Sequence, residues 1–296
     1  MTYRELLAEG VDFLRDNHIT EYENNGWLLF EYALCIKRHQ YFMKMNDGIE
    51  DEEAIARYRA YVAKRATHMP VQYITGAQDF MGLTFKVNEN VLIPRQDTEV
   101  LVENVLKAVE QLKDVTQREV HGDIRVLDMC TGSGCIAISI SNLANVDVTA
   151  VDISERALDV AKENARNLGS DRVKFIHSNL FEKINVNNGV EPSQRYDIIV
   201  SNPPYIPSKA VDGLMPEVRE HEPRLALDGT EDGLEFYRRI TEESCKYIKK
   251  GGWLMYEIGC EQGEDVKNIM LDNGYEKVEI IKDLAGLDRV LAGIFP

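Results

Sequence analysis

The sequence predicts an α/β protein in which a small helical region precedes a doubly wound, largely parallel β-sheet. The first observation behind this prediction is the alternation of apolar, strand-like segments with amphipathic, helix-like segments from residue 125 onward. The second is a glycine-containing loop, Cys130–Gly134, between a strand-like and a helix-like segment. The third is the apolar run Tyr196–Val200, which is soon followed by Pro203 and Pro204. Because proline cannot donate a ladder hydrogen bond, a buried strand has to end there.

The first 76 residues have the composition of a small helical domain. Apolar side chains recur at helical spacing between residues 3 and 17, and helix-favouring residues fill 26–38 and 52–65. We therefore expect helices over these three segments and a domain that covers residues 1–76. Its aromatic residues are interpreted as packing between the helices; a surface that docks a partner is the alternative.

A β-hairpin is predicted within a linker over residues 77–96, because residues 79–87 alternate in polarity around Gly82. The hairpin separates the helical domain from a larger domain, which we expect to cover residues 97–296.

The segment Arg95–Glu99 lies directly after this linker and before a helical pattern over residues 100–113. It has two interpretations. Asp97 or Thr98 caps the helix that follows, or the segment forms a lid that joins the hairpin to the active site.

The larger domain reads as repeated strand and helix units. Strands are expected at 125–129, 146–151, 173–177, 196–200, 253–258, 275–281 and 289–295. Helices are expected at 135–143, 154–167, 234–250 and 261–271. In a doubly wound sheet, right-handed crossovers place the loops that follow parallel strands at one edge. Functional residues are therefore expected after the strands.

Composition excludes several classes of protein. The formal net charge of −16 disfavours broad contact with DNA or RNA phosphates, which requires clustered lysine and arginine. The 5 cysteines are scattered without a CxxC pair or a histidine at ligand spacing, so we expect reduced thiols and no metal. No apolar run approaches the length of about 20 residues that a membrane span needs. We expect a cytoplasmic monomer that contacts neither membrane nor nucleic acid directly.

The glycine loop and one acidic residue predict a nucleoside-containing cofactor. Gly132 and Gly134 let the backbone approach a ligand closely. Asp152 ends the second strand, where an acidic group is the usual acceptor for ribose hydroxyls, although an isolated aspartate at this place is more often a helix N-cap. The loop lacks a full GxGxxG because Ile136 and Ala137 stand where the third glycine should fall. This shorter form is typical of enzymes that use S-adenosylmethionine (AdoMet), which has no pyrophosphate.

Two residues after the third strand, Asn179 and Leu180, fall where the edge and the face of an adenine would be contacted. The alternative interpretation is a polar loop residue followed by a core leucine. The pattern alone leaves both open.

The tetrapeptide Asn202-Pro203-Pro204-Tyr205 is the candidate catalytic motif. Asn202 Oδ1 and the Pro203 carbonyl can accept the two hydrogens of a planar NH2 group, and Tyr205 can stack on its face. An ordinary turn at the end of a strand is the alternative. The neighbouring His221 and Glu222 are interpreted as structural residues.

Five motifs together resemble the peptide chain release factor glutamine methyltransferases, the PrmC or HemK family. They are Ile93–Glu99, Cys130–Gly134, Asn202–Tyr205, Glu222–Leu227 and Asp283–Arg289. The resemblance covers residues 68–296, and the N-terminal region matches in length and position.

This resemblance implies a Rossmann-like class I AdoMet-dependent methyltransferase core of seven mostly parallel strands. It also implies transfer of a methyl group from AdoMet to the side-chain nitrogen, N5, of the glutamine in the Gly-Gly-Gln loop of release factors, with S-adenosylhomocysteine as product. The residues that would inherit cofactor contacts are Cys130, Thr131, Gly132, Ser133, Gly134, Asp152, Leu180 and Asn202. Asn179 is a further candidate cofactor contact because of its position after the third strand. The residues that would hold the substrate glutamine are Asn202, Pro203, Pro204 and Tyr205. Two departures stand out: Cys130 replaces a glycine, and Leu180 replaces a frequent aromatic residue.

Two other functions are compatible with the motifs. An adenine-N6 methyltransferase of DNA or RNA also presents a planar NH2 group to such a tetrapeptide, although the acidic charge of this chain argues against it. A non-catalytic AdoMet-binding protein could retain the same fold. Because the tetrapeptide is complete, an enzyme is the favoured interpretation.

Overall fold

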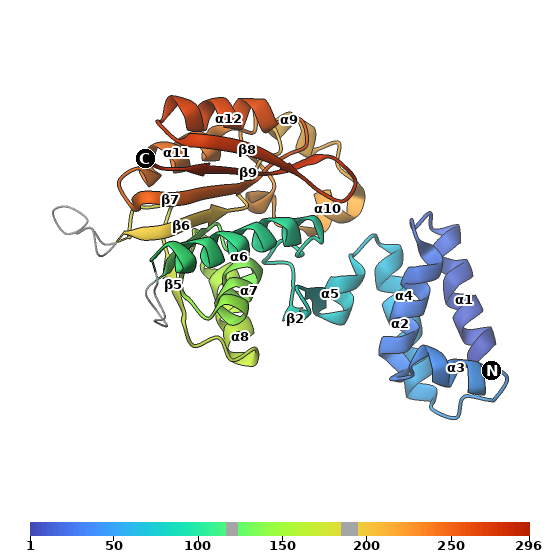
Figure 1. Ribbon diagram of the computed structural model, residues 1–296. Coiled ribbons are helices and arrows are strands. Elements are labelled where there is room, and N and C mark those ends of the chain that lie inside the picture. Colours follow the sequence, from blue (N-terminus) through green and yellow to red (C-terminus); the bar gives the residue numbers. More distant parts are fainter. Residues whose placement is uncertain (117–123, 185–194) are drawn as a thin grey trace. The chain divides into compact units, whose positions relative to one another are not determined.

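The computed structural model describes residues 1–116, 124–184 and 195–296. Two compact units are present (Figure 1). The first comprises residues 1–77 together with the short segment 215–221, and the second comprises residues 78–214 and 222–296. The chain therefore leaves the second unit once, contributes one short helix to the first, and returns.

The first unit is helical. Its helices are α1 (Tyr3–Asp16), α2 (Tyr22–Leu34), α3 (Arg38–Lys44), α4 (Glu52–Ala66), α5 (Val71–Thr75) and α10 (Pro216–His221). The expected helices at 3–17 and 52–65 are present, whereas the one expected at 26–38 begins and ends earlier, as α2. This helix stops because Cys35 adopts a left-handed conformation, with φ 51°. The short helices α3 and α5 were not predicted.

Aromatic rings form the centre of the helical unit. Phe30 packs edge-on against Tyr41 and Tyr58, with ring centroids 5.8 and 5.3 Å apart, and Trp27 packs edge-on against Tyr41 at 5.2 Å. The Tyr58 hydroxyl donates to the carbonyl of Gly26 at 3.2 Å. These rings are buried, as the packing interpretation expected, but that interpretation is wrong for two other aromatic residues of the unit, Tyr32 and Phe42, which are 46 % and 64 % exposed.

A buried ion pair fastens α10 within this unit. The Arg65 side chain of α4 is 2 % exposed, and its Nη2 lies 2.6 Å from Oε2 of Glu217. Arg65 Nε also donates to Asn25 Oδ1 at 2.7 Å. Burial lowers the pKa of Arg65, and the charge of Glu217 opposes that shift. Glu217 therefore offsets part of the cost of burying the guanidinium.

We predict that Glu217→Ala lowers the free energy of unfolding by about 3 to 5 kcal/mol, because it leaves a buried charge without its partner. The matched control is Glu9→Ala. Glu9 lies 2.6 Å from Arg59, but both side chains are about half exposed (43 % and 50 %). That change should cost less than about 1 kcal/mol. Chemical denaturation followed by Trp27 fluorescence measures both, and equal costs would contradict the assignment.

The second unit contains the predicted seven-stranded sheet, in the order β5-β4-β3-β6-β7-β9-β8. The strands are β3 (Arg125–Met129), β4 (Asp147–Asp152), β5 (Val173–His177), β6 (Tyr196–Ser201), β7 (Ile248–Glu257), β8 (Glu276–Lys282) and β9 (Asp288–Ile294). The first five in this order are parallel, and β9 pairs antiparallel with both β7 and β8. The expectation of a mostly parallel sheet is confirmed.

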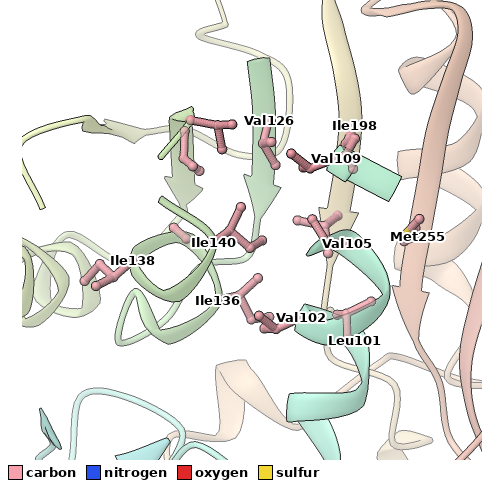
Figure 2. Close-up of a cluster of buried hydrophobic side chains, with 14 of the residues drawn as sticks. Leu101, Val102, Val105, Val109, Val126, Ile136, Ile138, Ile140, Ile198 and Met255 are labelled. Atoms are coloured by element: carbon pink, nitrogen blue, oxygen red, sulfur yellow. The ribbon is translucent and has the colours of Figure 1, made fainter. Parts of the chain in front are cut away.

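Helices cover both faces of this sheet (Figure 1). They are α6 (Asp97–Thr116), α7 (Cys135–Ala144), α8 (Glu155–Asn167), α9 (Ser208–Val211), α11 (Glu235–Ser244) and α12 (Gly263–Asp272), with a 3-10 turn, η2 (Arg224–Ala226). Successive strand residues point to opposite faces, so Ile198 packs with α6 and α7 whereas Ile199 packs with α11 and α12. Figure 2 shows the first of these clusters, where side chains of α6 and α7 gather against Val126, Ile198 and Met255.

In the second unit, one helix was predicted to be too long. The expected helix 234–250 ends at Ser244, and β7 begins at Ile248 rather than Trp253. The reason is pairing with β6, because the carbonyl of Tyr247 accepts a hydrogen bond from the Tyr196 N–H at 2.8 Å. The composition of this segment favours a helix, but pairing with β6, which is distant in sequence, decides its structure.

The predicted hairpin is confirmed, with strands β1 (Ala77–Phe80) and β2 (Leu83–Lys86). Met81 and Gly82 form its turn in left-handed conformations, with φ 50° and 74°. Asn164 of α8 accepts from the Lys86 N–H at 2.7 Å and donates to the Lys86 carbonyl at 3.0 Å. The end of the hairpin is therefore fixed to a helix of the sheet domain.

Across residues 1–116, 124–184 and 195–296, no helix is long and apolar enough to cross a membrane.

Candidate active site

A cavity of about 350 Å³ lies at the carboxyl ends of the central parallel strands. The predicted residues that line it are Cys130, Gly132, Asp152, Asn179, Leu180, Asn202 and Pro204. Segments from four strand ends thus meet at one place, as the loop rule for parallel sheets requires. The lining does not include the predicted residues Thr131, Ser133, Gly134, Pro203 and Tyr205.

The glycine loop enters α7 through left-handed conformations. The φ angles of Cys130, Gly132 and Gly134 are 65°, 56° and 81°. A non-glycine residue in this region costs roughly 1 to 2 kcal/mol, so Cys130 occupies a position where glycine would fit without strain. Thr131 turns away from the cavity and donates its hydroxyl to Asp128 Oδ2 at 2.5 Å. This hydrogen bond helps to hold the loop over the end of β3.

Asp152 is held by backbone N–H groups rather than acting as a helix cap. Its Oδ2 accepts from the Gly132 N–H and its Oδ1 from the Ser154 N–H, each at 2.8 Å. Ser154 itself caps α8 by accepting from Ala157. Burial raises the pKa of Asp152, and the N–H donors of Ser154 and Gly132 oppose the shift. A carboxylate with two bonds made still has lone pairs that can accept from a ligand.

Another part of the cavity wall combines an apolar surface with an amide. Leu180 is buried in a left-handed conformation, with φ 49°. Asn179 Oδ1 accepts from Arg239 Nη2 at 3.3 Å. Phe236 and Arg239, both from α11, also line the cavity. Sequence reasoning did not single out either residue, because nothing in a helical pattern shows which face will meet a distant loop.

The tetrapeptide 202–205 follows directly after β6. Pro203 and Pro204 are buried, whereas Asn202 and Tyr205 are half-buried. Asn202 Nδ2 donates to the Thr98 hydroxyl oxygen at 3.5 Å, so the other end of the amide, Oδ1, points away from Thr98. Thr98 lies in the first turn of α6.

Backbone contacts hold this motif in place. Gln262 Nε2 donates to the Tyr205 carbonyl at 3.0 Å, the Ile206 N–H donates to Leu227 at 3.1 Å, and the Gly229 N–H donates to Ile206 at 2.8 Å. Gly229 packs so closely that a Cβ there would lie 2.7 Å from the Cα of Tyr205. The sequence predictions included neither Gln262 nor Gly229. The motif is therefore rigid before any ligand binds.

The segment Arg95–Glu99 connects several parts of the second unit. The Arg95 side chain pairs with Glu222, which also accepts from the Ile93 N–H at 3.4 Å. Glu99 accepts from the Met81 N–H of the hairpin at 2.7 Å. Because α6 begins at Asp97, neither Asp97 nor Thr98 is its N-cap. The side chains of the segment instead join the hairpin, the tetrapeptide and the loop after it.

Glu257, the last residue of β7, is a further residue that the sequence predictions missed. Its residue exposure is 2 %, and within the described part of the chain its Oε2 has no hydrogen-bond partner. Burial raises the pKa of Glu257 to about 7, and the polar side chains of Thr98 and Asn202 nearby oppose the shift. Because Tyr256 pairs with Ser201, a buried carboxyl group therefore lies beside the first residue of the tetrapeptide.

Comparison with known proteins gives a consistent result. Residues 5–76 match the PrmC N-terminal domain, and residues 120–287 match a methyltransferase domain. A release factor glutamine methyltransferase of Clostridium acetobutylicum is 39 % identical, over 99 % of this chain and 99 % of its own length. One of Geobacter sulfurreducens is 42 % identical, over 90 % of this chain and 87 % of its own length.

Among solved structures, a release factor-specific protein-(glutamine-N5) methyltransferase of Alicyclobacillus acidocaldarius is 32 % identical. The match covers 72 % of this chain and 100 % of that one, with a TM-score of 0.39.

We predict that Gly229→Ala lowers the free energy of unfolding by about 1 to 3 kcal/mol, the usual cost of forcing a methyl group into a packed site. The new Cβ would meet the backbone of Pro204 and Tyr205, which cannot rotate aside. Gly213→Ala is the control, because its Cβ would meet only one ordinary contact, at 3.4 Å. Thermal unfolding measures both, and a Gly229→Ala protein as stable as the control would contradict the close packing.

Proposed function

The chain belongs to the family of release factor glutamine methyltransferases, and we propose that it transfers a methyl group from AdoMet to the side-chain nitrogen, N5, of a glutamine in a peptide chain release factor. The observation that carries this proposal is the position of Asn202, which both lines the cavity and begins the tetrapeptide. A cofactor in the cavity and an amide at the tetrapeptide would therefore be neighbours.

The residues around the cavity fit AdoMet. Asp152 can accept from ribose hydroxyls while Gly132 leaves room for a close approach. Leu180 and Phe236 offer apolar surfaces to an adenine, and Asn179 offers an amide to its edge. The volume of about 350 Å³ lies in the range of small-molecule sites. Phe236 would supply the aromatic surface that Leu180 lacks.

AdoMet, when bound, supplies an electrophilic methyl group on a sulfonium. The task of the protein is to make an amide nitrogen nucleophilic. That nitrogen reacts poorly because its lone pair is delocalised into the carbonyl, as in a peptide bond. Asn202 Oδ1 and the Pro203 carbonyl would accept its two hydrogens, and they would stabilise positive charge that grows on nitrogen. Tyr205 would hold the amide plane by stacking.

The rigidity of the tetrapeptide supports this role. Acceptors that are fixed in advance need no reorganisation when charge develops. Gln262 and Gly229 hold the backbone that carries these acceptors. No strong base is required, because a methylated amide nitrogen becomes acidic and loses its proton to water or a neighbour.

We propose that the helical unit recognises the release factor, since the second unit alone holds both the cavity and the tetrapeptide. The net charge of −16 suits a partner with basic surface. We further propose that the target is the glutamine of the Gly-Gly-Gln loop and that the enzyme acts as a monomer.

Incubation with labelled AdoMet and a release factor, followed by mass spectrometry, tests the activity. Labelled nucleic acid with unlabelled protein would instead support an adenine methyltransferase.

We predict that Asp152→Ala weakens AdoMet binding by about 10- to 100-fold, because a charge-assisted contact contributes about 1.5 to 3 kcal/mol. Asp147→Ala is the matched control, since Asp147 is exposed at the opposite end of the same strand. Calorimetry measures both affinities. If Asp152→Ala binds AdoMet within about twofold of the wild type, the ribose contact is wrongly assigned.

We predict that Asn202→Ala reduces kcat by roughly 100-fold or more, the usual effect of removing one preorganised polar group. The affinity for the release factor should change less, because it depends on a protein-sized interface. Single-turnover methylation at saturating AdoMet, beside a separate binding titration, distinguishes the two. Asn202→Asp keeps an acceptor and should retain partial activity. An Asn202→Ala enzyme that turns over normally once saturated would make the residue a docking contact only.

A further inference from the structure

Three polar side chains from one loop and one helix meet at the wall of the cavity. Asn179 lies in the loop after β5, Arg239 lies in α11, and both line the cavity. Asn179 Nδ2 donates to Glu182 Oε1 at 2.6 Å, and Arg239 Nη2 donates to Asn179 Oδ1 at 3.3 Å. Glu182 is exposed and is not among the described residues that line the cavity. One partner therefore holds the amide from outside the cavity, and the other holds it from the cavity wall.

These two partners leave the Asn179 amide with one orientation. A carboxylate accepts hydrogen bonds but cannot donate them, and a guanidinium donates but cannot accept. The NH2 end of the amide therefore has to face Glu182, and Oδ1 has to face Arg239. Exchanging the two ends would set donor against donor and acceptor against acceptor. The cavity wall thus carries an acceptor, Asn179 Oδ1, next to the donors of Arg239.

This part of the wall is joined directly to Asp152, the candidate ribose acceptor. The Asp152 carbonyl accepts from the Ser178 N–H at 3.0 Å, and Asp152 pairs in register with His177. Asn179 is therefore one residue away from a backbone contact with Asp152. A nucleoside whose ribose is held by the Asp152 carboxylate would bring its base into the same region, because a single bond joins the base to the ribose.

We propose that Arg239 and Asn179 together select an adenine over a 6-oxopurine, and that Arg239 also fixes the orientation of the Asn179 amide. Adenine carries an NH2 donor beside a ring nitrogen that accepts, and this pair complements the Oδ1 acceptor and the guanidinium donors. The contact with Asn179 uses one of the five N–H groups of the guanidinium, so a ring nitrogen can accept from another. The proposal deepens the proposed function and rests on it for the identity of the ligand.

A 6-oxopurine such as hypoxanthine does not fit this pair of groups. It has a carbonyl oxygen in place of the NH2 group, and its N1 carries a hydrogen in place of the lone pair. Whichever edge of the base faces the wall, the carbonyl oxygen would oppose Asn179 Oδ1. If the N1 edge faces the wall, the N1–H would also oppose the guanidinium donors. Each mismatch leaves a polar group without its hydrogen bond, which is the usual way in which a site built for one hydrogen-bonding pattern rejects another.

The test measures binding by calorimetry and involves no methyl transfer. It compares S-adenosylhomocysteine with S-inosylhomocysteine, which differ only at the 6-position and N1 of the base. The wild type should bind the adenine compound about 10-fold or more tightly. Arg239→Met keeps an apolar stem and removes the donors, so it should weaken S-adenosylhomocysteine about 10-fold and reduce the preference to about threefold or less. Asn179→Ala should reduce the preference in the same way. The double variant should lose less affinity than the two single losses multiplied together, because the two side chains act as a unit.

Arg238→Met is the matched control. Arg238 precedes Arg239 on α11, but it is exposed and its Nη1 donates to Asp232 Oδ1 at 3.2 Å. This change should leave both affinities and the preference unchanged. A third ligand, 5′-methylthioadenosine, has the adenine and lacks the amino acid, and Arg239→Met should weaken its binding as strongly as that of S-adenosylhomocysteine. If Arg239 instead held the carboxylate of the amino acid, Arg239→Met would weaken both homocysteine compounds equally and leave 5′-methylthioadenosine unchanged. That pattern would refute the proposal.

The outcomes separate this proposal from the proposed function. If the wild type binds the two homocysteine compounds equally, or if Arg239→Met keeps the preference, the selection role is refuted whatever the methylation of a release factor. If the preference is present and is lost in Arg239→Met, but the wild type methylates no release factor, the adenine contact stands and the proposed function fails. A wild type that binds neither compound overturns both proposals. Should Arg239→Met fold poorly, Asn179→Ala, which changes a loop residue, decides by the same ratio of affinities.

Discussion

The parallel pairing of β6 with β3 on one side and β7 on the other is the constraint on which the site depends. Register places Ser201 beside Met129 and beside Tyr256, so all three strands end at the same level. The residues that follow, Cys130, Asn202 and Glu257, are therefore brought together by backbone hydrogen bonds distributed along three strands. A shift of this register by one residue would turn alternate side chains to the opposite face and separate the three.

Packing makes this arrangement rigid. Ile198 and Ile199 point to opposite faces of the sheet, and each belongs to a separate buried cluster. Beyond the end of β6, backbone contacts continue the support: Gln262 holds the Tyr205 carbonyl, and Gly229 lies against the same residue. The double proline removes backbone freedom in between. The acceptors at the tetrapeptide are thus fixed by the sheet, by neighbouring loops and by covalent geometry together.

Features with a local signal could be predicted from the sequence. The alternation of strands and helices, the turn at Gly82, the glycine loop and the acid at the end of β4 each depend on a few consecutive residues. Predictions failed where pairing between segments distant in sequence decided the structure. In the segment 244–248, for example, residues of helical composition pair with β6 instead of continuing the helix. Thr98 was considered as a helix cap or as part of a lid, and Glu257 was not considered at all. Both residues lie beside Asn202 only because α6, β6 and β7 meet in the fold, and no short motif predicts that meeting.

Buried acids at this edge have a cost that varies with pH. Burial raises the pKa of Asp128 and of Glu257 to about 7, and it raises that of Asp152 as well. A carboxyl whose pKa is higher in the folded state than in the unfolded state contributes stability that is fully present below the unfolded value. For Asp128 and Glu257 that contribution is lost as the pH rises from about 4 to beyond about 7. The ionised forms of Asp128 and Glu257 are thus the forms that destabilise the fold. The strand pairing and the two buried clusters have to offset this cost, because a buried charge that lacks full compensation destabilises the folded state.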